Sequence, residues 1–288
     1  IDPCTLFLIG LLEMSSKTSL VSVVMPAYNA EKYISEAIES ILNQTFKDFE
    51  FIIIDDGSTD RTWEIIQEYA KKDERIVPLR NDKNLKICMT LNKGIEASKG
   101  KYIARMDSDD WSYPNRLEKQ VNFLEKNTDI VVCGGCLEVS DENLNLLYIR
   151  RYPTVDKIIR RKMFMYNAFA HPSVMFRGSS LREEEYYYDP DFYDAEDYDL
   201  YFRLGKNGSF ANLEDILLKY RVSSTSISYK RHTHQGLITL KVRSKAVFQY
   251  GYRIPFLSLL LQPFELIIVL LLPASVKYKL FSFMRKYV

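Results

Sequence analysis

The chain has 288 residues, of which 47% are hydrophobic, and it contains 20 Tyr and 16 Phe. This apolar content supports one large core or two fused lobes and excludes a disordered chain. The 39 basic residues balance the 38 acidic ones to a formal net charge of +1, so the chain lacks the overall positive field that draws proteins onto nucleic acid. We expect no nucleic-acid partner.

The N-terminal residues, 1–19, do not resemble part of a folded unit. The chain begins with Ile1 rather than Met, and the apolar stretch over 6–12 lacks a preceding basic segment and a small-residue cleavage site. We interpret 1–19 as a leader or an added segment rather than a secretion signal, with Met14 as a candidate natural start.

The four cysteines are too few and too unevenly spaced for a disulfide framework, which indicates a reducing compartment such as the cytosol. Cys133 and Cys136 have the spacing of a zinc knuckle, but no second pair accompanies them. They lie in an apolar, strand-like run that begins at Ile130, so we interpret them as small core residues.

The first half of the chain alternates short apolar runs with amphipathic ones. Buried-strand patterns predict strands over 20–25, 49–54, 76–79 and 102–104. Apolar residues at helical spacing predict helices over 34–42, 60–69 and 87–97. This alternation predicts a parallel sheet covered by helices on both faces.

Polar or acidic residues follow three of these strands. Residues 26–29 end the first strand, 55–58 the second and 107–110 the fourth. In parallel sheets ligands bind outside the carboxyl ends of the strands, because the crossover loops return there. We therefore expect the three clusters to converge on one edge of the sheet.

The cluster at 107–110 contains the carboxylates of Asp107, Asp109 and Asp110. Hard divalent cations prefer oxygen ligands, and such a cation stabilises the charge that grows on a departing diphosphate. Alternate carboxylates at a strand end can point to one side, so we predict that Asp109 binds the metal and that its neighbour meets ribose or a second metal position. The alternative is an acidic turn that caps the next segment.

A second acidic motif lies on the turn between the second strand and its helix. Asp55 and Asp56 offer acceptors for a nucleobase N–H. The alternative is structural: Thr59 or Asp60 can cap the next helix, while Gly57 relieves the turn. We expect both interpretations to hold for different residues of the motif.

The second half contains helices expected over 116–125 and 195–204, with mixed strands between them, and no linker separates it from the first half. The second helix is preceded by Asp194 and contains Glu196 and Asp197. The helix dipole favours anions there, so we expect depressed pKa values for these carboxylates. An ionised carboxylate can accept a proton from an acceptor hydroxyl. The alternative is an N-terminal cap.

From about residue 229 the chain is helical and basic, and it becomes apolar over 254–274. Three prolines and two polar residues interrupt this run: Pro255, Pro263, Pro273, Gln262 and Glu265. Four basic residues follow: Lys277, Lys279, Arg285 and Lys286. This pattern favours a helix at an anionic membrane surface. The alternatives are a buried C-terminal lobe or dimer surface, and a true membrane span.

With these motifs in order, the chain resembles the family-2 inverting glycosyltransferases with the GT-A fold, over roughly residues 20–228. The resemblance rests on six segments: VVMPAYN at 23–29, IDDGSTD at 54–60, LNKGI at 91–95, YIARMDSDD at 102–110, HPSVMF at 171–176 and AEDYDL at 195–200. It implies an α/β fold in which a Rossmann-like nucleotide-binding sheet is fused to an acceptor lobe. Residues 20–112 would form the nucleotide-sugar-binding half, 113–228 the acceptor-binding half with the catalytic base, and 229–288 a C-terminal helical extension that associates with the membrane.

The resemblance also assigns roles to single residues. The nucleotide base, most often uridine, would be bound by Pro26, Ala27, Tyr28, Asn29 and Asp56. Asp107 would reach ribose or the metal, and Asp109 would bind Mg²⁺ or Mn²⁺. Asp197 would be the general base, with Glu196 as the second candidate.

The implied reaction is a single in-line displacement that inverts the anomeric carbon. It would move a sugar from a nucleotide sugar, in this family most often a UDP-sugar, to a hydroxyl of a glycan or lipid-linked acceptor. The implied setting is bacterial surface-polysaccharide synthesis in the cytoplasm, at the inner face of the cell membrane.

Two positions depart from the family's pattern. Lys86 stands where the family often has Gly, and it can reach a phosphate of the nucleotide or stay solvated. No His follows the pair at 220–221, so a His that completes the site would come from His232 or His234, which are otherwise solvated residues of a helix. His171 is expected to order the acceptor-side wall.

Two alternative functions share part of this pattern. A nucleotidylyltransferase shares the nucleotide-binding sheet and the metal, but it carries a Gly-rich, Arg-containing first turn that residues 26–29 lack. A catalytically inactive, membrane-bound partner subunit is the non-enzyme alternative. The presence of Asp109 and Asp197 argues against it.

Overall fold

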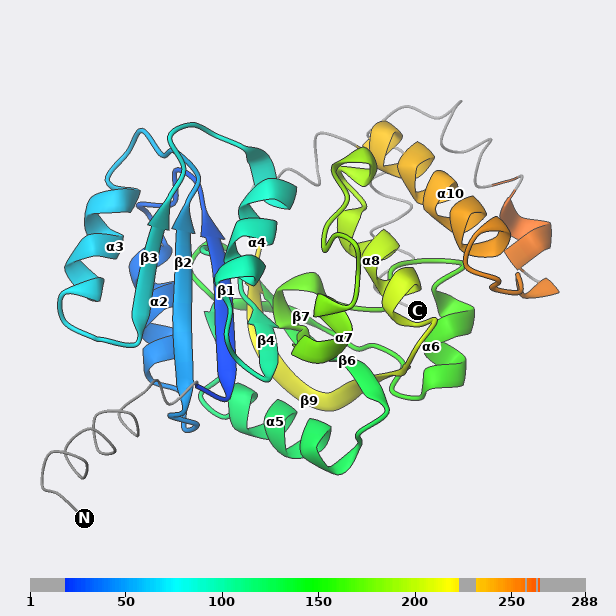
Figure 1. The fold of residues 1–288 in the computed structure, drawn as a ribbon, viewed down its shortest axis with the longest axis horizontal. Helices are drawn as coiled ribbons and strands as arrows, with labels where there is room; N and C mark the ends of the chain where they lie inside the picture. Colours follow the sequence, from blue (N-terminus) through cyan, green and yellow to red (C-terminus); the bar gives the residue numbers. More distant parts are fainter. Residues whose placement is uncertain (1–18, 223–231, 257, 263, 265–288) are drawn as a thin grey trace, which may run out of the picture.

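The computed structural model describes residues 19–222, 232–256, 258–262 and 264. A nine-stranded mixed sheet runs through it (Figure 1). Its strands are β1 (Val21–Ala27), β2 (Phe49–Asp55), β3 (Ile76–Arg80), β4 (Tyr102–Arg105), β5 (Trp111–Ser112), β6 (Ile130–Ser140), β7 (Leu146–Arg150), β8 (Met175–Arg177) and β9 (Ser209–Arg221).

The strand order is β3-β2-β1-β4-β8-β6-β9-β5, with β7 paired to β6. The first four of these strands are mutually parallel, so their carboxyl ends share one edge. β8 runs antiparallel to both β4 and β6 and carries the sheet into the second half. The two halves of the sequence therefore share one continuous sheet.

Helices cover both faces of this sheet (Figure 1). The described α-helices are α2 (Ile34–Leu42), α3 (Thr62–Ala70), α4 (Lys86–Ala97), α5 (Arg116–Lys126), α6 (Asp156–Lys162), α7 (Gly178–Arg182), α8 (Glu196–Leu204) and α10 (His232–Phe248). Two 3₁₀ helices are also described, η1 (His171–Ser173) and η2 (Pro190–Phe192). Helices α2, α3 and α5 pack on one face, and α4, α6, α7, α8 and α10 on the other.

Strand alternation builds the two cores. Along β1, Val23 and Met25 belong to the cluster that packs against α2, α3 and α5, whereas Val24 belongs to the cluster on the α4 and α8 face. Successive side chains of a strand point to opposite faces, so a strand buried on both sides is apolar throughout. This explains the continuous apolar runs of β1 and β2.

The predicted elements of the first half, and the helices predicted over 116–125 and 195–204, are confirmed to within two residues at each end. Pro26, Ala27 and Asp55 lie inside their strands rather than in the loops that follow. Cys133 and Cys136 are buried in β6, which confirms that they are core residues.

The C-terminal part of the described chain packs on the second half. In α10, Arg243 Nε donates to the hydroxyl of Tyr198 in α8 at 3.0 Å. The helix predicted from about 229 is thus present over 232–248. Within the described residues, no helix combines the length and apolarity needed to cross a membrane. Residues 1–18, most of the apolar run and the basic residues after it lie outside the description.

The turn after β2 provides a test of the packing. Gly57 has a φ of +71°, and a Cβ there would lie 2.7 Å from the Lys83 carbonyl carbon; Gly251 has a φ of +74° with nothing nearby. Both alanine substitutions cost about 1–2 kcal/mol for a left-handed backbone. We expect Gly57→Ala to lower the free energy of unfolding further than Gly251→Ala, because only the first forces two backbone segments apart. Urea titrations measure the difference, and equal losses would contradict it.

Candidate active site

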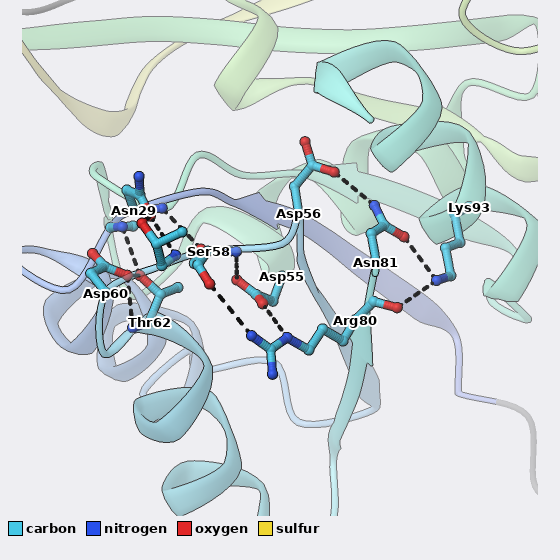
Figure 2. Close-up of polar contacts among 11 residues, drawn as sticks. Asn29, Asp55, Asp56, Ser58, Asp60, Thr62, Arg80, Asn81 and Lys93 are labelled. Carbon is cyan, nitrogen blue, oxygen red and sulfur yellow. Dashed lines mark hydrogen bonds and ion pairs between the residues drawn. The ribbon is translucent and has the colours of Figure 1, made fainter. Parts of the chain in front are cut away.

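The loops after β1 and β2 are tied to each other. Asn29 has a φ of +49°, a left-handed conformation that Asn tolerates better than most residues. Its Oδ1 accepts a hydrogen bond from the Thr59 N–H at 2.9 Å, and its own N–H donates to Ser58 Oγ at 2.9 Å (Figure 2). Asp60 accepts from the Thr62 N–H at 3.0 Å, so it contacts the first residue of α3, but Arg61 stands at the N-cap and makes no side-chain cap.

One side chain of the predicted base-binding loop is left open. Pro26 and Ala27 are buried strand residues, and Asn29 is engaged with the next loop. Tyr28 is 47% exposed. Its ring is therefore the group of this loop best placed to stack on a planar ligand.

Asp56 is buried and holds the segment between β3 and α4. Its Oδ1 accepts from Asn81 Nδ2 and from the Leu85 N–H, both at 2.8 Å, and its Oδ2 accepts from the Lys86 N–H at 2.9 Å. Lys93 Nζ in turn donates to Asn81 Oδ1 at 2.8 Å (Figure 2). A carboxylate has about four lone-pair sites, so Asp56 fixes this segment and keeps capacity for one more donor.

Lys86 occupies a strained backbone position. Its φ of +67° lies in the left-handed region, which explains why Gly suits this place in the pattern. Its Nζ lies 5.4 Å from the centre of the Tyr193 ring, so the side chain extends toward the second half. A phosphate contact by Lys86 stays a prediction.

Three carboxylates gather after β4. One oxygen of each of Asp107, Asp109 and Asp110 lies within 4.8 Å of those of the other two. Asp109 is open to solvent, whereas Asp110 is fully buried. Asp110 Oδ1 accepts from the Arg221 N–H at 2.9 Å, while its Oδ2 has no hydrogen-bond partner among the described residues.

This crowding shifts the acidity of the cluster. Asp109 reaches solvent but is surrounded by protein, and this desolvation and the charge of Asp107 raise its pKa to about 6. Burial and the charge of Asp109 raise the pKa of Asp110 well above its usual value. Three oxygen ligands, one of them buried and unpartnered, fit a hard divalent cation such as Mg²⁺ or Mn²⁺, whose charge would offset the repulsion.

Two buried arginines hold this cluster; both lie in segments named above, but neither was assigned a role from the sequence. Arg105, the last residue of β4, pairs through Nη2 with Asp107 Oδ1 at 2.5 Å. Arg221, the last residue of β9, donates from Nε to the Asp109 carbonyl at 2.7 Å. Both arginines could have been recognised in the sequence as charged residues at the end of apolar strands. A charge buried there needs a partner, which points to the neighbouring carboxylates.

Glu196 and Asp197 begin α8 as predicted, but the prediction of depressed pKa values was wrong. Burial and the charge of Asp197 raise the pKa of Glu196 to about 7, and burial raises the pKa of Asp197. Desolvation therefore outweighs the helix dipole.

The two carboxylates also differ in their surroundings. Asp197 is partly exposed, and its Oδ2 accepts from Asn167 Nδ2 at 2.7 Å. Glu196 is 8% exposed, and within the described part of the chain its Oε2 has no hydrogen-bond partner. Asp197 is therefore the more accessible and better oriented member of the pair.

The histidines lie apart from the acidic loops in the chain. His171 Nε2 lies 2.8 Å from the Tyr188 hydroxyl, and burial lowers the pKa of His171 well below its usual value, so the ring is neutral. His234 Nδ1 lies 2.9 Å from Asp194 Oδ2. The side chain of His232 lies outside the description, so its predicted role is not tested.

An acidic cluster lies at the carboxyl edge of the parallel strands, where α/β sheets bind ligands, and a carboxylate pair begins a helix of the second half. The model of the family "Glycosyl transferase family 2" matches residues 22–183, and the chain belongs to this family. This membership disfavours the nucleotidylyltransferase alternative.

Curated relatives agree with this assignment. The chain is 36% identical to a glycosyltransferase of Haemophilus influenzae over 239 residues, covering 80% of this chain and 74% of the relative. It is 39% identical to a glycosyltransferase of Methanocaldococcus jannaschii over 233 residues, covering 78% and 80%. It is 35% identical to the O-antigen biosynthesis glycosyltransferase WbnJ of Escherichia coli over 213 residues, covering 72% and 81%.

Solved structures show the same fold at low sequence identity. TarS 1–349 of S. aureus in complex with UDP-GlcNAc superposes with a TM-score of 0.61 at 20% identity, covering 87% of this chain and 79% of that one. The mannosyltransferase PcManGT from Pyrobaculum calidifontis in complex with GDP-Man and Mn²⁺ gives 0.66 at 13% identity, covering 93% and 81%. The predicted GT-A fold is confirmed.

The raised pKa of Glu196 predicts a pH dependence of stability. A carboxyl group whose folded pKa is raised stabilises the fold at low pH, and this contribution is lost as the pH rises through about 7. We expect the melting temperature of the wild-type chain to fall between pH 5 and 8 by about 3 °C more than that of Glu196→Gln, which cannot ionise. Parallel melting-temperature profiles of the two proteins would contradict the burial argument.

Proposed function

We propose that the chain transfers a sugar from a nucleotide sugar to a hydroxyl of a glycan or lipid-linked acceptor, with inversion and with the help of a divalent cation. The observation that carries this proposal is the convergence of the Asp107, Asp109 and Asp110 carboxylates at the end of β4. Membership of glycosyl transferase family 2 supports the reaction class.

The first half would bind the nucleotide. Tyr28 would stack on the base and Asp56 would accept its N–H, which favours uridine because uracil carries one imide N–H between two carbonyls. Support comes from the exposure of the Tyr28 ring and the spare acceptor capacity of Asp56. TarS, a protein with the same fold, binds UDP-GlcNAc.

Asp109 would be the main metal ligand, with Asp107 shared between metal and ribose. When bound, Mg²⁺ or Mn²⁺ would stabilise the negative charge of the departing diphosphate. The buried Asp110 would hold the loop in place through Arg221, because one of its oxygens is already committed to that N–H. Mn²⁺ is present in the complex of the mannosyltransferase that shares this fold.

Asp197 would act as the general base. Its carboxylate takes the proton of the acceptor hydroxyl while that oxygen bonds to the anomeric carbon. The bond from the anomeric carbon to the phosphate oxygen breaks, and the nucleoside diphosphate leaves with the electron pair. The hydrogen bond from Asn167 supports this role, because it orients Asp197 and leaves its other oxygen for the substrate. Glu196 is the weaker candidate, since it is more buried.

The two acidic sites give separable predictions. We expect Asp109→Asn to abolish Mn²⁺-dependent stabilisation by nucleotide sugars. We expect Asp197→Asn to keep that stabilisation and to lower transfer by roughly 100- to 10,000-fold, the range of a lost general base. Thermal-shift titrations with UDP- and GDP-sugars report binding. Release of nucleoside diphosphate, with bacterial lipid extract as the acceptor source, reports transfer.

Asp215→Asn is the control, because Asp215 is an aspartate on the surface whose ion pair, among the described residues, is with Lys119. Transfer by Asp197→Asn at the wild-type rate would disprove the assignment of the base. Unchanged Mn²⁺-dependent stabilisation of Asp109→Asn would disprove the assignment of the metal ligand.

The C-terminal part would attach the enzyme to the inner face of the cell membrane, with the site in the cytoplasm. Large apolar side chains are exposed there: Phe248, Phe256, Leu259, Leu260 and Phe264. The sequence continues with four basic residues over 277–286. Apolar residues next to basic ones favour contact with anionic lipid. The relative WbnJ is named for O-antigen biosynthesis, which supports a role in building a polysaccharide.

Membrane contact is tested with the full-length chain and vesicles. We expect sedimentation with phosphatidylglycerol vesicles, and at least a tenfold weaker partition for the variant Phe256→Ser/Leu260→Ser/Phe264→Ser, since each lost side chain removes about 1.5–3 kcal/mol of apolar burial at full insertion. Leu146→Ser/Leu147→Ser, which removes two exposed apolar residues of β7, is the matched control. Equal sedimentation of all three proteins would contradict the proposal.

A further inference from the structure

Arg105 is a buried cation at the centre of the proposed site. It is 6% exposed and ends β4, two residues before Asp107. Along β4, Tyr102 and Ala104 belong to the core on the α2 and α5 face, and Ile103 to the core on the α4 and α8 face. Strand alternation therefore places the side chain of Arg105 on the face that carries α8.

The guanidinium of Arg105 is only partly satisfied. Nη2 pairs with Asp107 Oδ1, but Nε and Nη1 are buried and have no hydrogen-bond partner among the described residues. Leaving buried donors of a charged group unpaired is costly, so most such groups have a partner. The unmet donors therefore indicate an acceptor that arrives with the substrate.

The surroundings of Arg105 indicate which part of the substrate carries this hydrogen-bond acceptor. Arg105 Nη2 pairs with Asp107 of the proposed metal cluster. Its side chain also lies on the sheet face covered by α8, the helix that begins with Glu196 and Asp197. Arg105 thus lies beside the metal cluster, on the face that carries the proposed base. In an in-line displacement, the transferred sugar lies between the leaving diphosphate and the base.

We propose that Arg105 binds the sugar of the nucleotide-sugar donor, with Nε and Nη1 donating to oxygens of the sugar while Nη2 holds Asp107. This inference rests on the proposed function and adds a residue that recognises the sugar rather than the nucleotide. The planar fork of Arg suits this task, because it can hold a carboxylate and present two further N–H groups in a fixed geometry.

The comparison of a nucleotide with its nucleotide sugar tests this inference. With Mn²⁺ present, binding is measured for UDP, UDP-glucose, UDP-galactose, UDP-N-acetylglucosamine, GDP and GDP-mannose. For Arg105→Lys, which keeps the charge beside Asp107 but loses the fork, we expect at least about tenfold weaker binding of the nucleotide sugar that the wild type prefers. We expect binding of the matching nucleoside diphosphate to change by less than about twofold.

Arg203→Lys is the matched control, because Arg203 is a buried arginine whose partners, Asp199 and Glu184, complete its ion pairs away from the acidic loops. Arg105→Gln is the second variant if Arg105→Lys does not fold, and melting temperatures check both. Equal weakening of nucleotide and nucleotide sugar would overturn the inference in favour of a diphosphate contact. Unchanged binding of both would overturn it in favour of donors satisfied by water.

A different experimental result would overturn the proposed function itself. If the wild-type chain bound none of the six nucleotides with Mn²⁺, the proposed function would be overturned and this inference with it. If the wild type bound a nucleotide sugar more tightly than its nucleoside diphosphate and Arg105→Lys kept that preference, only the role of Arg105 would be overturned.

Discussion

The crowding of negative charge at the end of β4 is the constraint on which the site depends. Asp107, Asp109 and Asp110 approach one another within 4.8 Å in a partly desolvated place, where repulsion between carboxylates is strong. The protein offsets this repulsion with Arg105 on one side and Arg221 on the other. Even with both arginines in place, Asp110 Oδ2 has no hydrogen-bond partner among the described residues. A divalent cation would supply the positive charge that is still missing there.

The same region shows how distant segments are joined around that charge. Arg221 ends β9, and besides its bonds to Asp109 and Asp110 it pairs with Glu36 of α2 at 2.7 Å. Asp56 fixes the segment before α4 in a similar way. Asp56 and Asp110 thus each position a loop and leave part of their bonding capacity open, which is how one set of residues can stabilise the fold and still bind a ligand.

The sequence was sufficient to predict the first half of the fold because β1, β2 and β4 are buried on both faces and are therefore apolar, and polar or acidic residues follow each of them. It did not predict the pairing of Trp111 and Ser112 with β9, since a two-residue strand leaves no periodicity. It missed Arg105 and Arg221, because their role depends on contacts between segments far apart in the chain. Local pattern specifies elements, whereas charge balance is a property of the assembled structure.

The pKa values of the α8 carboxylates also depend on tertiary contacts that the local sequence does not predict. Position at a helix N-terminus predicts a depressed pKa, but that effect is worth about 0.3–1 kcal/mol at exposed sites, while desolvation of a buried carboxyl group can exceed it several-fold. Burial is set by the second-half segments that pack around α8, among them the one that carries Asn167. Because Asn167 donates to Asp197 alone of the pair, the fold favours ionisation at Asp197 and leaves Glu196 with a pKa of about 7. Neighbouring carboxylates in one turn thus differ through tertiary contacts, and this inequivalence is what the proposed assignment of a single base requires.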